Sequence, residues 1–143
     1  MAPFALADVV SLHARATADN RGLIGAAQIA AMKPGSFLIN TARDTLVDEA
    51  AIVAALAAGH LAGLAVDLVS PSPTTGRHPL LAFPNVIITT HIGGATHETL
   101  HHGGEMAAAE IRRYLAGEPL RNVANRDALE AGAETSAMAT GAT

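Results

Sequence analysis

Apolar and polar positions along the chain predict strands that alternate with helices. Short runs rich in Val, Ile and Leu are typical of strands, whereas Ala-rich stretches with three- and four-residue apolar spacing favour helices. Strands are predicted over residues 8–13, 37–40, 61–69 and 85–91, and helices over residues 26–32, 47–60 and 97–115. This alternation indicates an α/β fold with a parallel sheet.

Three segments carry a more specific pattern. The run FLIN, from Phe37 to Asn40, is continuously apolar until its last residue, as expected for a strand that is covered on both faces. Residues 126–143 are small, polar and without a period, so we expect a disordered tail. The last predicted helix has one packing face, formed by Leu100, Gly104, Ala107, Ile111 and Leu115.

The composition excludes several classes of protein. The net charge of −4 argues against a nucleic-acid partner, because phosphate binding needs clustered Lys and Arg. The absence of cysteine excludes disulfides and thiolate metal sites. No apolar run approaches the length of a membrane span, and the first residues lack the basic segment of a signal peptide. We therefore expect a cytoplasmic protein with no membrane partner.

Three polar residues follow predicted strands. Arg43, Asp67 and His91 each lie at or just beyond the end of a strand. In parallel α/β sheets, ligands bind outside the carboxyl ends of the strands. One edge of the sheet could therefore gather a cation, an anion and an imidazole. Because loops are polar in general, the pattern alone leaves open that these are unrelated surface residues.

Several motifs in series resemble the D-isomer-specific 2-hydroxyacid dehydrogenases, the family of phosphoglycerate, glyoxylate/hydroxypyruvate and formate dehydrogenases. The matching segments include ADVVSLH, GSFLINTAR, AGLAVD, NVIITTHIGGAT and YLAGEPLRNVAN, and they run in order over residues 7–125. The resemblance implies a Rossmann-type parallel sheet flanked by helices and an NAD or NADP cofactor. It also implies the reversible reduction of a small 2-oxo acid to a 2-hydroxy acid.

The resemblance assigns a role to each polar residue at the strand ends. Arg43 matches the arginine that binds the carboxylate of the substrate, and a guanidinium suits this role because its donors form a planar fork. His91 matches the histidine that exchanges a proton with the substrate oxygen. Asp67 matches the carboxylate that anchors the nicotinamide carboxamide. The alternatives are a surface arginine at a strand end and a structural histidine.

Further cofactor positions are implied by the same resemblance. The backbone beside the nicotinamide matches the NTAR and HIGG motifs, and the strand end beside the adenosine matches LHAR. These cofactor-binding candidates are His13, Ala14, Thr41, Ala42, Gly93 and Gly94.

The sequence departs from the family in the loop after the third strand. Ser72 stands where the family has a glutamate that stabilises the charged imidazolium, and a serine hydroxyl can only form hydrogen bonds. We therefore expect His91 to be a weaker acid catalyst at neutral pH. Asp44 also replaces the usual glycine after Arg43, so we expect it to offset part of the guanidinium charge.

A second departure concerns the pyrophosphate of the cofactor. The family binds it on a G-x-G-x-x-G loop, and this sequence contains no such motif. We expect residues 1–125 to be the carboxyl-terminal part of a dinucleotide-binding domain, with a return helix and an incomplete cofactor site. The first predicted strand would then lack its usual neighbour, so we expect the chain to form a homo-oligomer such as a dimer. The alternative is a non-catalytic Rossmann-like remnant that serves only as an association module.

A third hypothesis comes from the motif HETLH, residues 97–101, which matches the H-E-x-x-H pattern of zinc hydrolases. His97 and His101 would share a helix face, and Glu98 could activate a zinc-bound water. The position of a third histidine in the longer form of the motif holds Ala107. The motif also falls in the first turn of its helix, which disfavours a cation. We therefore expect no metal site.

Overall fold

The computed structural model describes residues 2–70 and 78–126. The chain forms two compact units, one ending at Thr96 and the other beginning at His97. Within the described residues, no helix combines the length and the apolar character that crossing a membrane requires.

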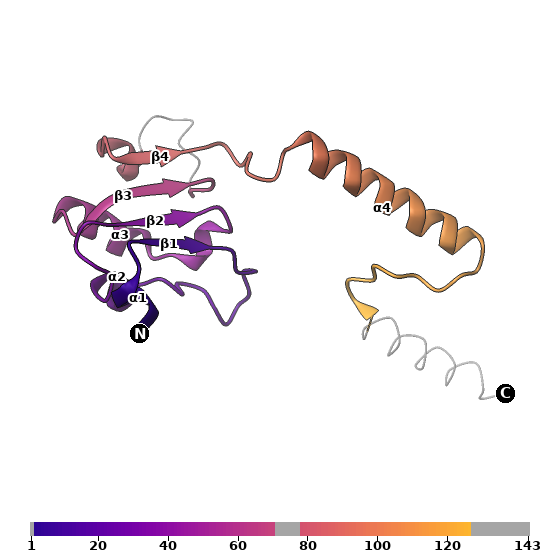
Figure 1. The fold of residues 1–143 in the computed structure, drawn as a ribbon, viewed down its shortest axis with the longest axis horizontal. Helices are drawn as coiled ribbons and strands as arrows, with labels where there is room; N and C mark the ends of the chain where they lie inside the picture. Colours follow the sequence, from indigo (N-terminus) through magenta and orange to yellow (C-terminus); the bar gives the residue numbers. More distant parts are fainter. Residues whose placement is uncertain (1, 71–77, 127–143) are drawn as a thin grey trace. The chain divides into compact units, whose positions relative to one another are not determined.

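The first unit contains a sheet of four parallel strands that lie side by side in chain order (Figure 1). The strands are β1 (Val9–Leu12), β2 (Ser36–Asn40), β3 (Leu61–Val66) and β4 (Val86–Ile88). The predicted α/β fold with a parallel sheet is therefore confirmed. The last residues of the strands pair with one another in a single row, in the order Leu12, Asn40, Val66 and Ile88. The segments that follow the strands consequently leave the sheet at one common edge.

The helices of the first unit precede β1 or connect successive strands. They are α1 (Ala2–Leu6), α2 (Ala26–Ala30) and α3 (Glu49–Ala57), with the 3-10 helices η1 (Asp44–Leu46) and η3 (Pro79–Ala82). The helix predicted over 26–32 ends at Ala30, because Ala31 is the C-cap and the N–H of Met32 bonds to the carbonyl of Ile29 in a tighter last turn. In α3, Asp48 is the N-cap and accepts a hydrogen bond from the N–H of Ala51. The sequence did not predict α1.

One face of the sheet carries the core. Leu38 and Leu64, which are paired on β2 and β3, are buried together with Ile29 of α2 and Ile52 of α3. Phe37, the neighbour of Leu38 in β2, points to the opposite face. The core also includes Leu12, Ile24, Met32, Leu46, Ala55, Leu56, Leu61, Val66 and Leu80.

The opposite face of the sheet is partly exposed in the described part of the chain. Val9, Phe37 and Ile87 are 51%, 47% and 65% exposed, and β2 alternates between buried and more exposed positions. The expectation that the FLIN strand is covered on both faces was therefore wrong. The physical reason is that α2 and α3 both contribute their buried residues to the core on the other face.

A buried histidine joins the loop before β4 to α3. The side chain of His78 is 1% exposed, and its Nε2 lies 3.2 Å from Oε2 of Glu49. The N–H of Leu80 donates to Nδ1 of His78. Because Nδ1 accepts this hydrogen bond, the ring N–H is assigned to Nε2, which approaches Glu49 but meets no hydrogen-bond geometry within the described residues.

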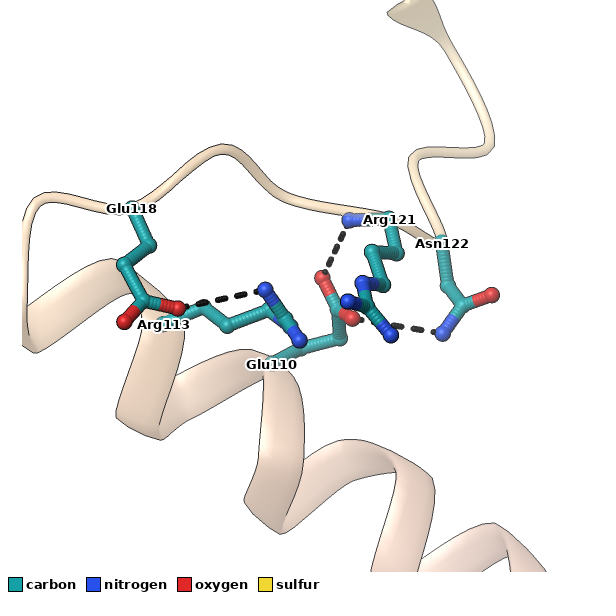
Figure 2. A network of polar contacts seen from close by, with 5 residues as sticks. All are labelled: Glu110, Arg113, Glu118, Arg121 and Asn122. Atoms are coloured by element: carbon teal, nitrogen blue, oxygen red, sulfur yellow. Dashed lines mark hydrogen bonds and ion pairs between the residues drawn. The ribbon is translucent and has the colours of Figure 1, made fainter.

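The second unit contains α4 (His97–Leu115) and the segment that follows it. Glu110 accepts hydrogen bonds from the N–H of Arg121 and from Nδ2 of Asn122, and Arg113 pairs with Glu118 (Figure 2). These contacts hold residues 118–122 against the helix. The apolar positions of α4 that the sequence predicts to form a packing face include Leu100, Ile111 and Leu115, which are 70%, 60% and 78% exposed.

Candidate active site

The turn after β2 is organised by a buried amide. Asn40 is 1% exposed, and its Oδ1 accepts from the N–H of Ala42 while its Nδ2 donates to the carbonyl of Arg43. The side chain of Arg43 is exposed, and its Nη1 donates to the carbonyl of Ala42 over 2.6 Å. Asn40 thus fixes the backbone from which the guanidinium extends toward solvent.

Asp44 does not pair with the guanidinium of Arg43 in the way that the sequence led us to expect. Oδ1 of Asp44 accepts from the N–H of Thr45, and the described residues include no ion pair between Asp44 and Arg43. Asp44 is the first residue of η1, and its carboxylate bonds to the N–H of the next residue instead of pairing with Arg43.

Asp67, directly after β3, is buried and accepts three hydrogen bonds. Its Oδ1 accepts from the hydroxyl of Thr89 and the N–H of Ile92, and its Oδ2 accepts from the N–H of Gly93. The hydroxyl of Thr89 lowers the pKa of Asp67 below the usual 3.8, and the N–H of Gly93 lowers it further. Burial opposes this shift, while the N–H of Ile92 and the charge of His91 add to it. The carboxylate is therefore ionised at neutral pH.

His91 follows β4 in an unusual backbone conformation. Its φ is 60°, which makes it the one non-glycine residue with positive φ in the described part of the chain. Residues with a Cβ avoid this region, and such conformations persist where surrounding contacts impose them. The N–H of His91 donates to the carbonyl of Asp67 over 2.8 Å, and its imidazole lies on an exposed stretch of chain.

The turns after β2 and β4 meet at Gly93. A Cβ on Gly93 would lie 2.9 Å from Oδ2 of Asp67 and 3.9 Å from Cβ of Thr41. A Cβ on Gly94 would meet open space. Together with the hydrogen bond from the N–H of Asp67 to the carbonyl of Asn40, these contacts gather the segments of Arg43, Asp67 and His91 at one edge.

The remaining cofactor candidates lie beside a cavity of about 490 Å³ at the ends of β1 and β2. Within this region, Oγ of Ser11 lies 2.8 Å from Nε2 of His13. The residues that line the cavity are His13, Ala14, Arg15, Ala16, Thr41, Ala42 and Arg43. The other candidates, Asp67, His91, Gly93 and Gly94, are not among them, and Ser72 lies outside the described residues.

Comparison with known proteins identifies the family. Residues 2–93 match the model described as "D-isomer specific 2-hydroxyacid dehydrogenase, NAD binding domain". This chain belongs to the D-isomer-specific 2-hydroxyacid dehydrogenases. The resemblance found in the sequence is therefore confirmed, and the sheet is the Rossmann type of this family.

Individual members of the 2-hydroxyacid dehydrogenase family are similar over most of the chain. D-3-phosphoglycerate dehydrogenase of Escherichia coli (strain K12) is 42% identical over 113 residues, which are 76% of this chain and 28% of that protein. Glyoxylate reductase of Aeropyrum pernix is 36% identical over 86% of this chain and 37% of its own length. D-lactate dehydrogenase of Lactobacillus jensenii, solved with NAD+, superposes with a TM-score of 0.77 at 29% identity over 85% of this chain and 41% of its own. The chain thus spans well under half the length of these relatives.

The zinc-hydrolase hypothesis gains no support from the described residues. His101 lies on α4 and pairs with Glu105, with 3.3 Å between Nε2 and Oε1. No group of three or more potential metal ligands occurs in the part of the chain that the structure describes.

Two residues that organise the site were not identified from the sequence. Asn40 and Thr89 carry no catalytic chemistry, but they hold the backbone of Arg43 and the carboxylate of Asp67. Asn40 ends a strand and Thr89 lies two residues before His91, so position relative to the strand ends was the available signal.

Proposed function

We propose that this chain provides the nicotinamide- and substrate-binding edge of an NAD(P)-dependent 2-hydroxyacid dehydrogenase, which interconverts a small 2-hydroxy acid and the corresponding 2-oxo acid. One observation carries the proposal: the last residues of β2, β3 and β4 pair side by side. The segments that contain Arg43, Asp67 and His91 therefore leave the sheet at the same edge. Family membership supports the reaction class, and the NAD+ bound to the D-lactate dehydrogenase supports the cofactor class.

Two exposed side chains would act on the substrate. Arg43 uses one donor on the carbonyl of Ala42, which leaves the other guanidinium donors for the substrate carboxylate. His91 would accept the hydroxyl proton of the 2-hydroxy acid during oxidation and return it to the carbonyl oxygen during reduction. The nicotinamide cofactor supplies or accepts the hydride when it is bound. Ser72 carries no charge that could stabilise the imidazolium.

The described residues fit the nicotinamide end of the cofactor. Gly93 leaves no room for a side chain beside Asp67, whereas Gly94 borders open space that a flat ring can approach. A carboxylate has about four acceptor positions. Three are used in Asp67, so Oδ2 can still accept one N–H of the carboxamide. The cavity that His13, Ala14, Thr41, Ala42 and Arg43 help to line would extend this surface toward the adenosine.

Binding measured residue by residue tests this proposal. The ¹⁵N-labelled chain is titrated with NADH and with small 2-oxo acids, and the amide shifts are followed by NMR. We expect shifts at Thr41, Gly93 and Gly94, and loss of the 2-oxo acid response in Arg43→Gln. The charge-retaining variant Arg15→Lys is the control, because Arg15 lines the same cavity. Shifts elsewhere, or none at saturating ligand, would reject the proposal.

Turnover is a separate question from binding. We expect little or no NADH oxidation by this chain alone, because the sequence contains no glycine-rich pyrophosphate loop. Rapid turnover would contradict that expectation. The cytoplasmic location expected from the sequence stays a prediction.

The exposed sheet face favours a second function, association with another copy of the chain. Val9 and Ile87 are more than half exposed on the face opposite the core, and β1 pairs with β2 alone among the described strands. Exposed apolar faces and free strand edges favour pairing. We expect sedimentation velocity to detect an oligomer that weakens in Val9→Thr/Ile87→Thr. Leu81→Thr is the matched control, since Leu81 is 50% exposed in η3. A wild-type monomer at all concentrations would exclude association.

A further inference from the structure

Backbone carbonyls hold the start of the turn at His91, whereas a side-chain carboxylate holds the residues that follow it. The N–H of Thr89 donates to the carbonyl of Val66, and the N–H of His91 donates to the carbonyl of Asp67. These backbone bonds fix the chain as far as His91. Beyond it, the N–H groups of Ile92 and Gly93 bond to the carboxylate of Asp67. The orientation of that carboxylate therefore decides the direction in which the chain leaves His91.

A carboxylate does not fix its own orientation. The torsion that rotates the carboxyl plane of an aspartate is broad, so the plane must be set by hydrogen bonds. Oδ1 of Asp67 receives both the hydroxyl of Thr89 and the N–H of Ile92, while Oδ2 receives the N–H of Gly93. Among these three donors, Thr89 lies on the fixed part of the chain before His91. The hydroxyl of Thr89 thus ties the carboxylate plane to the sheet.

We infer that Thr89 is a positioning residue, whose hydroxyl orients the carboxylate of Asp67 and thereby holds the turn that presents His91 to the substrate. The inference rests on the proposed function only for the role given to His91. The positive φ of His91 supports it, because a strained backbone persists where its neighbours impose it. Gly93 supports it too: the turn packs directly on Oδ2 of Asp67, so that no room remains there for a Cβ.

The lowered pKa of Asp67 agrees with this arrangement. The hydroxyl of Thr89 is the largest cause of the shift, ahead of the N–H of Gly93. A hydroxyl that stabilises the ionised carboxylate also keeps it a pure acceptor, which the N–H groups of Ile92 and Gly93 require.

Three variants of the whole chain separate positioning from general stability. Thr89→Val keeps the shape of the side chain and removes the hydroxyl, whereas Thr89→Ser keeps the hydroxyl. Thr90→Val makes the same change one residue later, at a threonine that is not among the donors to Asp67 in the described structure. Amide hydrogen exchange and the ¹³C titration of the Asp67 carboxyl group are measured by NMR without cofactor or substrate.

We expect Thr89→Val to raise the pKa of Asp67 toward 3.8. We also expect exchange at Ile92 and Gly93 to accelerate by roughly three- to tenfold, the equivalent of one lost hydrogen bond. Exchange at His91 should change less, because its N–H bonds to a backbone carbonyl. Thr89→Ser and Thr90→Val should both keep the wild-type pKa of Asp67 and the wild-type exchange rates.

Equal acceleration in Thr89→Val and Thr90→Val, or no change in Thr89→Val, would overturn the inference. If Thr89→Val does not fold, the wild-type chain still decides the matter. The Cβ resonance of Thr89 must then shift with pH at the pKa of Asp67. A Cβ resonance that does not shift with pH would also overturn the inference. Because no ligand is present, failure of NADH or 2-oxo acids to bind would reject the proposed function and leave this result standing.

Discussion

Gly93 lies so close to Asp67 that a Cβ on the glycine would be 2.9 Å from Oδ2 of the aspartate. The same oxygen accepts the N–H of Gly93 over 2.8 Å. The turn after β4 is therefore packed on the carboxylate as well as bonded to it. The two adjacent glycines therefore differ: a side chain at Gly93 would collide with Asp67, whereas a side chain at Gly94 would have open space.

Alanine at the two glycines should have unequal effects. Gly93→Ala forces the carboxylate of Asp67 to move and should lower the free energy of unfolding by about 1–3 kcal/mol, as overpacking does. Gly94 has open space and no positive φ, so Gly94→Ala should change stability by less than about 0.5 kcal/mol. Urea denaturation of both variants measures the difference. Equal losses would mean that the contact with Asp67 carries no energy.

The buried carboxylate should make stability depend on acid pH. The pKa of Asp67 is lowered in the folded chain, so its contribution is present above the unfolded value of 3.8 and is lost as the pH falls through the lower folded value. The difference in unfolding free energy between the wild type and Asp67→Asn should therefore shrink as the pH falls below about 4. Urea denaturation between neutral pH and pH 3 measures it. A difference that stays constant would show that Asp67 titrates normally.

The amide of Asn40 should control the backbone of Arg43. Asn40→Ala leaves the N–H of Ala42 and the carbonyl of Arg43 without their partner, at a cost of about 1–3 kcal/mol. Asn40→Asp keeps the acceptor and loses the donor, so it should also weaken 2-oxo acid binding by displacing Arg43. Urea denaturation and NMR titration measure the two effects.

Asn85 provides the matched control for Asn40. Its Nδ2 donates to the carbonyl of Ala62 at the opposite end of the sheet, and its side chain is exposed. Asn85→Ala should therefore cost less than Asn40→Ala and leave 2-oxo acid binding unchanged. A loss of binding in Asn85→Ala would show that the response reports global unfolding.

The contact between His78 and Glu49 should require an acceptor. Nε2 of His78 is buried and lies 3.2 Å from Oε2 of Glu49 without meeting hydrogen-bond geometry in the described structure. Glu49→Gln keeps an oxygen within reach of this nitrogen, whereas Glu49→Leu removes it. We expect Glu49→Leu to be less stable than Glu49→Gln by about 1 kcal/mol in urea denaturation. Both variants remove the charge from the first turn of α3, so their comparison isolates the acceptor. Equal stabilities would mean that the approach of Glu49 to His78 is not a stabilising hydrogen bond, in agreement with its geometry in the described structure.

The sequence alone determined the strands, the helices α2, α3 and α4, and their order along the chain, but not α1 or the 3-10 helices. Apolar periodicity located the four strands and α4, because local propensity and the spacing of buried residues are encoded residue by residue. The motifs around Arg43, Asp67 and His91 identified the family for the same reason. The ends of the elements were predicted less accurately. The strand predicted over 61–69 ends at Val66, the last residue that pairs with a neighbouring strand.

Only the tertiary structure decided how the site is held and which surfaces are covered. Asp67 bonds to residues more than twenty positions away in sequence, and no local pattern records which donors a carboxylate will meet. The exposure of Phe37 likewise depends on where α2 and α3 pack, so the FLIN run could not reveal that one of its faces is open. Sequence spacing fixes local conformation, whereas hydrogen-bond partners and burial depend on contacts that form only when distant segments meet.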